Sequence, residues 1–189
     1  GTMAKRTGNY VTVNNRRLVD VWLDEYKDIY YAANPKMKSV NRGDISKRVQ
    51  WRSEHQCKPF KSYLDKFFPN MLIPDKDHTL ARGDLKCLAN AMCVDTGGQN
   101  FAGAKAGLYH CHHMGGNQAI AYMKNKYLYM FPADSCLHWD SDNSRVLLYN
   151  CNMRDNMKWE HTKQNKLIHP QGRADMCLTA SGKELLVKP

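Results

Sequence analysis

Cysteine and histidine are the residues of this sequence with the most distinctive chemistry. None of the seven cysteines in the 189 residues forms a Cys-x-x-Cys pair, the usual element of a structural zinc site. Isolated cysteines are typical of disulfide halves in a protein of the secretory pathway, and the odd number leaves at least one thiol without a partner in the chain. The seven are Cys57, Cys87, Cys93, Cys111, Cys136, Cys151 and Cys177. One cluster could hold a metal, formed by His110, Cys111, His112 and His113.

The chain is strongly basic, with 28 Lys and Arg against 18 Asp and Glu and a formal net charge of +10. Such a charge suggests an anionic partner. Much of it precedes residue 87, where basic and acidic residues mix as they do on a solvated face. Since no nucleic-acid-binding motif or basic–aromatic stripe accompanies the charge, we expect no nucleic-acid partner.

No apolar run approaches the roughly 20 residues that cross a bilayer, and no signal peptide is recognisable. We therefore expect a soluble piece whose targeting segment, in a natural parent, would lie upstream. Residues 1–4 resemble an expression scar.

The first half of the chain has helical periodicity. Apolar residues recur every fourth position and predict a helix over residues 16–33, which Asn34-Pro35 should end because the residue before a proline avoids the helical region. Asp44 could cap a second helix that runs through Trp51. Pro59 suits the first turn of a third helix.

From about residue 78 the sequence changes to short apolar runs separated by Gly, Asn, Asp and Ser, which is typical of an all-β barrel or sandwich. This half also repeats at steps of 43 and 41 residues. The repeated triplets are Cys93-Val94-Asp95, Cys136-Leu137-His138 and Cys177-Leu178-Thr179. The first two are each followed by an aromatic-x-Cys, in Tyr109-His110-Cys111 and Tyr149-Asn150-Cys151, and then by an asparagine. A period near forty residues indicates stacked equivalent repeats, and three of them suit a trefoil.

This repeat resembles the signature of ricin-type β-trefoil lectins, which is Cys-Leu-Asp, a later Tyr-x-Cys and a terminal Gln-x-Trp. The first repeat keeps the acid as Asp95 but has Gln118-Ala119-Ile120 at the last motif. The second keeps Trp159, with Met157 in place of the glutamine and His138 in place of the aspartate.

The helical half is similar to the segment that ends the catalytic domain of polypeptide N-acetylgalactosaminyltransferases. The similar residues are, in order, 21–27, 30–33, 43–45, Arg48, 57–64, Pro69 and 73–75. Residues 109–112 and 115–118 of the first repeat also resemble the family. After the scar we expect the C-terminal helical segment of a GT-A-type catalytic domain with its linker over residues 5–74. A mainly β, ricin B-type lectin domain should follow over 75–189, with repeats at about 78–130, 131–170 and an incomplete 171–189.

The family transfers GalNAc from UDP-GalNAc to Ser or Thr, with manganese, in the Golgi lumen. The resemblance therefore implies a single-pass type II membrane enzyme that initiates mucin-type O-glycosylation. Lys5-Arg6-Thr7 resembles only the start of the loop after the last metal-ligand histidine. Since the metal and nucleotide site lies upstream, we expect no cofactor, no catalytic residue and no turnover in this chain. The implied partners are GalNAc-bearing glycopeptides and the upstream catalytic domain. The alternative is a basic domain that contacts acidic or mucin-like acceptors without a specific sugar site.

By resemblance, the sugar-binding residues are Asp95, Tyr109 and Asn117, with His112 as a fourth contact. A carboxylate accepts hydrogen bonds from two vicinal hydroxyls, an aromatic ring packs the apolar face of a galactose-type sugar, and an amide donates and accepts. Each residue also has a structural interpretation, since Asp before Thr-Gly-Gly is usually a turn former and a strand tyrosine usually packs. His138 cannot be an ionised acceptor, so we expect the second repeat to be structural.

By the same resemblance, Cys93 pairs with Cys111 and Cys136 with Cys151. The first pairing, and the opposite directions of adjacent strand residues, disfavour a metal at the histidine cluster. Cys57 resembles a family cysteine whose partner lies upstream. The partner of Cys177 is expected beyond the last residue, at about 192–195, so that the trefoil would lack its final strands. Cys87 has no counterpart.

Overall fold

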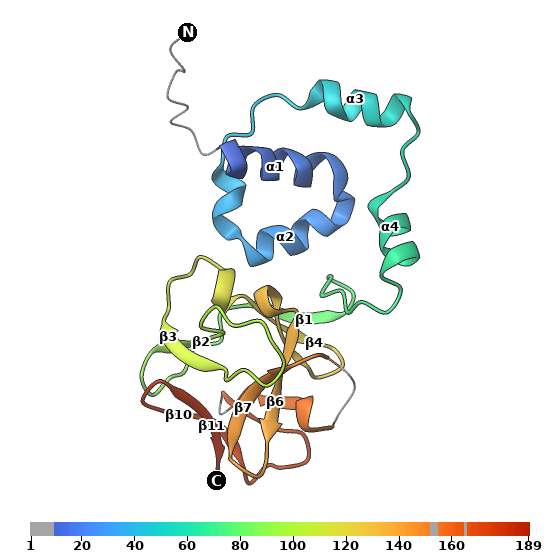
Figure 1. The fold of residues 1–189 in the computed structure, drawn as a ribbon. Coiled ribbons are helices and arrows are strands. Elements are labelled where there is room, and N and C mark those ends of the chain that lie inside the picture. The colour runs from blue at the N-terminus through green and yellow to red at the C-terminus, as the bar shows by residue number, and fades with distance from the viewer. Residues whose placement is uncertain (1–9, 152–154, 165) are drawn as a thin grey trace. The chain divides into compact units, whose positions relative to one another are not determined.

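The structure, a computed structural model, describes residues 10–151, 155–164 and 166–189. The chain divides into two compact parts (Figure 1). The helical part is Gly1–Tyr31 with Pro35–Met71, and the strand part is Ala32–Asn34 with Leu72–Pro189. No helix among the described residues has the length and apolar character needed to span a membrane.

From residue 10 on, where the structure describes it, the helical part has four short α-helices and two 3-10 turns. They are α1 (Tyr10–Trp22), η1 (Asp24–Tyr26), α2 (Lys27–Ala33), η2 (Pro35–Ser39), α3 (Ser46–Glu54) and α4 (Phe60–Phe67). The prediction of one helix over 16–33 is wrong, because the helix breaks at Leu23 and Asp24, where Asp24 has a φ of 49°. The Asp24 carboxylate accepts hydrogen bonds from both terminal nitrogens of Arg52, at 2.7 and 2.9 Å, and from the Phe60 N–H at 2.8 Å. These three bonds hold the Asp24 carboxylate at the break.

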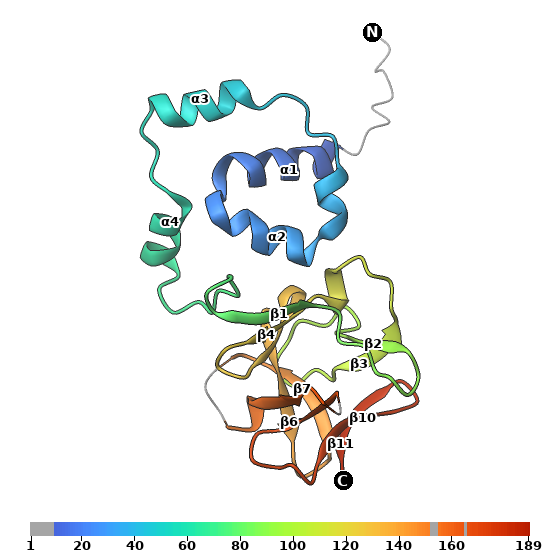
Figure 2. The same ribbon diagram turned by 180° about the vertical axis from the view of Figure 1, so that it is seen from behind.

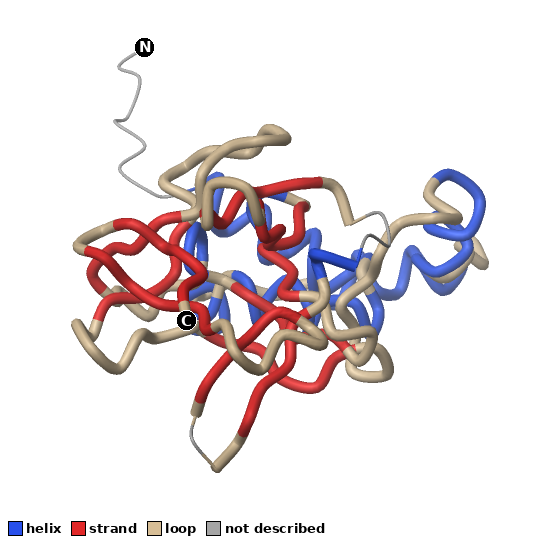
Figure 3. Tube along the Cα trace, turned by 90° about the horizontal axis from the view of Figure 1, so that it is seen from below, coloured by secondary structure: helices blue, strands red, loops and turns tan. Residues whose placement is uncertain are grey.

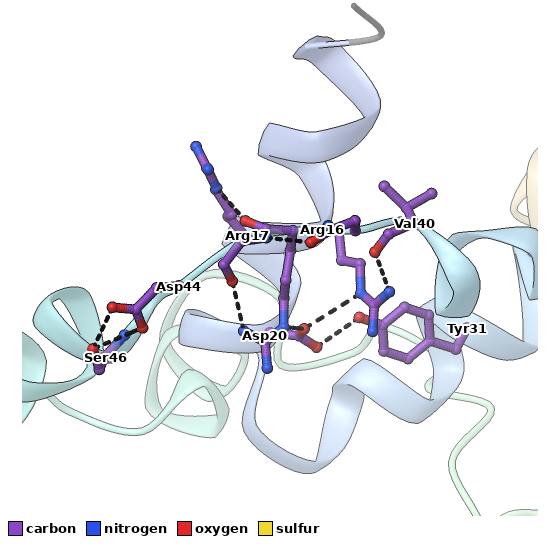
Figure 4. Close-up of polar contacts among 10 residues, drawn as sticks. Arg16, Arg17, Asp20, Tyr31, Val40, Asp44 and Ser46 are labelled. Carbon is purple, nitrogen blue, oxygen red and sulfur yellow. Dashed lines mark hydrogen bonds and ion pairs between the residues drawn. The ribbon is translucent and has the colours of Figure 1, made fainter.

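Asp20 holds α1 to the segments that follow it (Figure 4). It accepts a hydrogen bond from the Tyr31 hydroxyl at 2.6 Å and pairs with Arg42, whose Nε lies 2.5 Å from Oδ2. Arg16 pairs with the same carboxylate and donates to the carbonyl of Val40. Further along, Asp44 accepts the Ser46 N–H at 2.8 Å in a local turn just before α3, whose N-cap residue is Ile45 without a side-chain cap.

The strand part contains eleven described strands in groups of four, four and three. The first repeat has β1 (Thr79–Gly83), β2 (Met92–Asp95), β3 (Gly107–His110) and β4 (Ile120–Met123). The second has β5 (Leu128–Met130), β6 (Ser135–Asp140), β7 (Arg145–Tyr149) and β8 (Trp159–Thr162). The third has β9 (Leu167–Pro170), β10 (Cys177–Ser181) and β11 (Glu184–Lys188). In this grouping, one repeat gives way to the next within residues 123–128 and again within 162–167.

Three hairpins with one register carry the repeat. Cys93 lies opposite Tyr109 in β2–β3, Cys136 opposite Tyr149 in β6–β7, and Cys177 opposite Lys188 in β10–β11. The second strands of these hairpins meet, since Glu184 of β11 pairs with Gly107 of β3 and Leu186 of β11 with Arg145 of β7. The strands curl around a common centre (Figures 2 and 3).

The core lies where the three hairpins meet. The register makes Leu108, Leu148 and Val187 equivalent, and all three are buried. Trp159 of β8 is fully buried in the same cluster, and its indole N–H donates to the carbonyl of Leu137 at 3.0 Å. The burial of equivalent positions explains why the apolar runs recur with the cysteines.

Candidate functional site

The hairpin β2–β3 and the 3-10 turn η3 (Gly116–Gln118) bring the predicted site residues into one region. Asp95 ends β2, Tyr109 lies on β3, and His112 and Asn117 lie on the chain between β3 and β4. The Cys93–Cys111 disulfide joins β2 to the loop that carries His112. The second expected disulfide, Cys136–Cys151, forms at the equivalent place in the second repeat. Cys57, Cys87 and Cys177 are free thiols.

The Asp95 carboxylate is buried and held at both oxygens. Its exposed fraction is 6%, Oδ1 accepts the Gly97 N–H at 2.7 Å, and Oδ2 accepts the side-chain amide of Gln118 at 2.9 Å. Gly97 follows with a φ of 61°, which favours glycine, so Asp95 does form the turn that its sequence context suggests. A carboxylate oxygen has two lone pairs, so each oxygen can accept one more hydrogen bond.

Gln118 is a site residue that sequence reasoning missed. It is fully buried, and its amide nitrogen bridges Asp95 Oδ2 and the carbonyl of His110, both at 2.9 Å. Its amide oxygen accepts the His112 N–H at 3.1 Å. One side chain therefore fixes the carboxylate and both ends of the His110–His112 segment. The signals in the sequence were its place at the first position of the Gln-x-Trp motif and the resemblance of residues 115–118 to the family.

Tyr109 has its ring largely in solvent, with an exposed fraction of 53%. Its described aromatic contact is an edge contact with the ring of His110, with the ring centroids 5.7 Å apart. The Tyr109 ring is therefore not packed as a covered strand tyrosine would be.

Asn117 and His112 lie beside the turn that follows Asp95. The Asn117 carbonyl accepts the Thr96 N–H at 3.1 Å, and a Cβ atom on Gly98 would lie 3.9 Å from the Asn117 amide nitrogen. Both side chains are half-buried. The Met114 N–H donates to Nδ1 of His112 at 3.2 Å, so in the neutral ring Nε2 carries the hydrogen and is a donor.

The second repeat places the equivalent residues against one another. The His138 and Tyr149 rings lie 4.9 Å apart, and the Asn156 amide nitrogen lies 2.6 Å from Nε2 of His138. A Cβ atom on Gly103 would lie 3.5 Å from the Tyr149 hydroxyl, so a loop also approaches this tyrosine. The position of Gln118 is taken by the fully buried Met157, which has no amide to offer. The ring surface that is open at Tyr109 is therefore partly occupied at Tyr149.

The histidine cluster does not form a metal site in the described structure. Cys111 is in a disulfide, His113 contacts Asp84 with Nδ1 2.7 Å from Oδ2, and Nδ1 of His112 accepts a backbone N–H. Within residues 10–151, 155–164 and 166–189, no three His, Cys, Asp or Glu side chains converge as metal ligands would.

Comparisons with known proteins bear on both parts of the chain. The family described as ricin-type beta-trefoil lectin domain matches residues 81–188. Polypeptide N-acetylgalactosaminyltransferase 13 of Homo sapiens is 36% identical over 142 residues, which cover 75% of this chain and 25% of that protein. Polypeptide N-acetylgalactosaminyltransferase 3 of Taeniopygia guttata is 34% identical over 184 residues, which cover 92% of this chain and 27% of that protein. The chain thus spans about a quarter of the length of these relatives.

Among solved structures, the crystal structure of GalNAc-T7 with UDP, GalNAc and Mn2+ has a TM-score of 0.66 and 28% identity, covering 93% of this chain and 32% of that one. The hemolytic lectin CEL-III has a TM-score of 0.51 at 20% identity over 58% of this chain and 27% of its own, and supports the fold of the strand part alone.

Proposed function

Because the chain belongs to the ricin-type β-trefoil lectin family, we propose that its first repeat binds a terminal GalNAc residue on glycosylated acceptor peptides. The resemblance to polypeptide N-acetylgalactosaminyltransferases is confirmed by the relatives, and the mainly β trefoil fold by the family match and the strands. The likeness to GalNAc-T7 covers 93% of this chain and so includes residues of the helical part as well as the strand part.

The observation that carries the proposal is the pair of bonds that fixes Asp95. The Gly97 N–H and the Gln118 amide orient the carboxylate before any ligand arrives, and the open ring of Tyr109 lies on the partner strand of the same hairpin. A preorganised acceptor binds with a smaller entropic cost than a mobile one.

The chemistry suits a galactose-type sugar. In GalNAc the axial 4-hydroxyl and the equatorial 3-hydroxyl are gauche neighbours, so both can donate to one carboxylate, and the axial 4-hydroxyl points in a direction that a glucose-type sugar does not offer. The remaining lone pairs of Asp95 would accept both hydroxyls, and burial strengthens these bonds. Tyr109 would cover the C–H face opposite, while Asn117 and the Nε2–H of His112 would contact the same hydroxyls.

At the level of the whole protein, we propose a lectin module that retains an acceptor already bearing GalNAc near a catalytic domain. Retention raises the effective concentration of further Ser and Thr sites. UDP-GalNAc and Mn2+ would belong to that upstream domain, since the described residues of this chain offer no set of metal ligands. By the same family argument, the parent would be a membrane-anchored enzyme in the Golgi lumen.

The test is a titration of the chain with a GalNAc-bearing glycopeptide, followed by NMR chemical shifts. We expect saturable binding in about the millimolar range, as for a few polar contacts to one sugar, and its loss in Asp95→Asn. His138→Ala is the matched control, because it alters the equivalent residue of the second repeat and should retain binding. Equal binding by the wild type and Asp95→Asn would reject the site.

The competing function, a basic surface for acidic acceptors, predicts a different result. Its binding would be lost with added salt and would be unaffected by free GalNAc. Binding through the proposed site would be competed by free GalNAc and only weakly by its 4-epimer GlcNAc, whose equatorial 4-hydroxyl does not fit the same carboxylate geometry.

A further inference from the structure

A small cavity lies where the starts of β3, β7 and β11 meet. Glu184 of β11 pairs with Gly107 of β3, and Leu186 of β11 pairs with Arg145 of β7, so three hairpins border one space. The cavity has a volume of about 130 Å3. One buried apolar residue of each repeat lines it, namely Ala106, Val146 and Leu185. The cavity therefore has an apolar base contributed equally by the three repeats.

Three exposed basic side chains, one from each repeat, line the same cavity. They are Lys105, Arg145 and Lys183. Lys105 and Arg145 hold equivalent positions, since each lies four residues before the tyrosine opposite a disulfide cysteine. The carbonyl of Lys183 accepts the Leu108 N–H at 2.9 Å, which fixes its backbone beside β3. The internal repeat thus brings three cations to one place.

The carboxylates near the cavity do not neutralise these cations. Glu184 also lines the cavity, and Asp140 lies opposite Arg145 in the β6–β7 pairing. Asp140 instead accepts the side-chain amide of Asn143 at 2.9 Å. Within the part of the chain that the structure describes, all ion pairs lie elsewhere. Three cations and one carboxylate leave the lining with a net charge of +2.

This arrangement of charge suits an anion with several oxygens. Like charges brought together repel, and a cleft lined by one sign of charge concentrates counter-ions. An arginine donates two hydrogen bonds in a fixed plane, and a lysine ammonium binds as a compact point charge. A sulfate or phosphate ester has three terminal oxygens, one for each cation, whereas a carboxylate has two. The number and origin of the cations therefore favour a tetrahedral ester group.

We propose that this cavity binds a sulfate or phosphate ester group, with Lys105, Arg145 and Lys183 as its donors. Glu184 accepts from a hydroxyl of the molecule that carries the ester, so that a neutral polyhydroxy carrier is preferred to an acidic one. The site does not depend on the proposed GalNAc site, whose residues do not line the cavity. It also differs from a diffuse basic surface, because it requires saturable binding at one place.

The test is an NMR titration of the chain with glucose 6-sulfate and with glucose 6-phosphate, at an ionic strength held constant with NaCl. Glucose is the carrier because its equatorial 4-hydroxyl does not fit the proposed GalNAc site, and free glucose is the uncharged control. We expect saturable binding of at least one ester in about the millimolar range. The amide signals of Gly107, Val146 and Leu185 should shift, while that of Gly97 should not.

Two double variants separate the cavity from general charge attraction. Arg145→Gln with Lys183→Gln should weaken ester binding at least about tenfold, because it removes two charge-assisted hydrogen bonds. Lys124→Gln with Lys163→Gln removes the same charge from exposed side chains outside the cavity and should retain binding. If the first double variant does not fold, Lys105→Gln alone should still weaken binding several-fold.

Binding of the sulfate ester alone, or of the phosphate ester alone, would support the site and identify its ligand. Equal weakening in the two double variants, or shifts caused equally by free glucose, would overturn the proposal. Asp95→Asn should retain ester binding, and the cavity variant should retain glycopeptide binding. Failure of the GalNAc site and failure of the cavity are therefore distinguishable.

Discussion

Gln118 donates its side-chain amide to Oδ2 of Asp95 at 2.9 Å, across 23 residues of sequence. The same nitrogen reaches the carbonyl of His110, so the amide of one buried residue sets the orientation of the acid and the path of the loop beside it. In the second repeat, Met157 fills the corresponding buried position, and the residue equivalent to the acid is His138. The contrast between these two positions underlies the first two predictions.

Gln118→Leu should weaken glycopeptide binding although Gln118 need not touch the sugar. The variant keeps the volume but leaves Asp95 Oδ2 and the His110 carbonyl without their donor, which should cost about 1–3 kcal/mol of stability. We expect about a tenfold loss of affinity, equivalent to about 1.4 kcal/mol. A positioning role predicts that this affinity loss is accompanied by altered amide shifts of Gly97 and His112, measured by NMR. A folded variant with unchanged affinity would show that Gly97 alone suffices to orient the acid.

His138→Asp should not create a second sugar site by itself, whereas His138→Asp with Met157→Gln should. The single change adds a carboxylate that has no amide to hold it, and the double change reproduces the Asp95–Gln118 pair next to Tyr149 and Asn156. Isothermal titration with a divalent glycopeptide, or counting perturbed NMR signals in each repeat, distinguishes one site from two. A second site in the single variant would contradict the role given to Gln118.

Removal of the two disulfides should have different consequences for binding. Each closes a loop of 15–18 residues, so replacing either pair by serines should cost about 3 kcal/mol on the chain-entropy model. Only the Cys93 and Cys111 replacement should also weaken GalNAc binding, because that bond anchors the loop carrying His112. Denaturant titration and glycopeptide affinity, measured on both double variants at a temperature where each is folded, check the difference.

Asp24 should make the turn between α1 and α2 sensitive to acid. Hydrogen bonding to Arg52, with help from the Phe60 N–H and against the effect of burial, holds the pKa of Asp24 below the ordinary value of an aspartate. A depressed folded-state pKa means that the stabilisation is present above the unfolded pKa and is lost as pH falls from about 4 through the folded value. The Phe60 amide resonance should titrate in that range in the wild type. The chemical shift of this resonance should not change with pH in Asp24→Asn. If it still titrates in that variant, the effect belongs to another group.

The stabilising contribution of Tyr129 should have the opposite pH dependence and be lost at alkaline pH. Burial, with the hydrogen bond that its hydroxyl donates to Asp134 at 2.7 Å, raises the pKa of Tyr129 well above 10. A raised folded-state pKa leaves the contribution complete below about pH 10 and removes it as pH rises beyond that value. Denaturant unfolding should therefore show a steeper loss of stability as pH rises above about 10 in the wild type than in Tyr129→Phe. Parallel losses would mean that the phenol ionises equally in the folded and unfolded chain.

The sequence was sufficient for features that repeat, and insufficient for features that depend on distant partners. Cysteines at steps of 43 and 41 residues located equivalent hairpins, and the resemblance supplied both disulfide pairings. The break at Asp24 was missed because its partners Arg52 and Phe60 lie 28 and 36 residues further on, while the local periodicity favours an unbroken helix. The roles of Gln118 and of the ring contact at Tyr149 were missed for the same reason. Asp95, Tyr109, His112 and Asn117 do come together, and their contact with a sugar stays a prediction.

The meeting of the three hairpins has a consequence for how the chain acquires its structure. Each hairpin closes within about twenty residues, but Gly107 and Glu184 pair across most of the strand part. Local closures are fast, whereas contacts of high sequence separation delay folding. The hairpin that carries Asp95 and Tyr109 can therefore form, and its disulfide close, before β11 docks at the centre. We therefore expect the arrival of the last hairpin to set the overall folding rate.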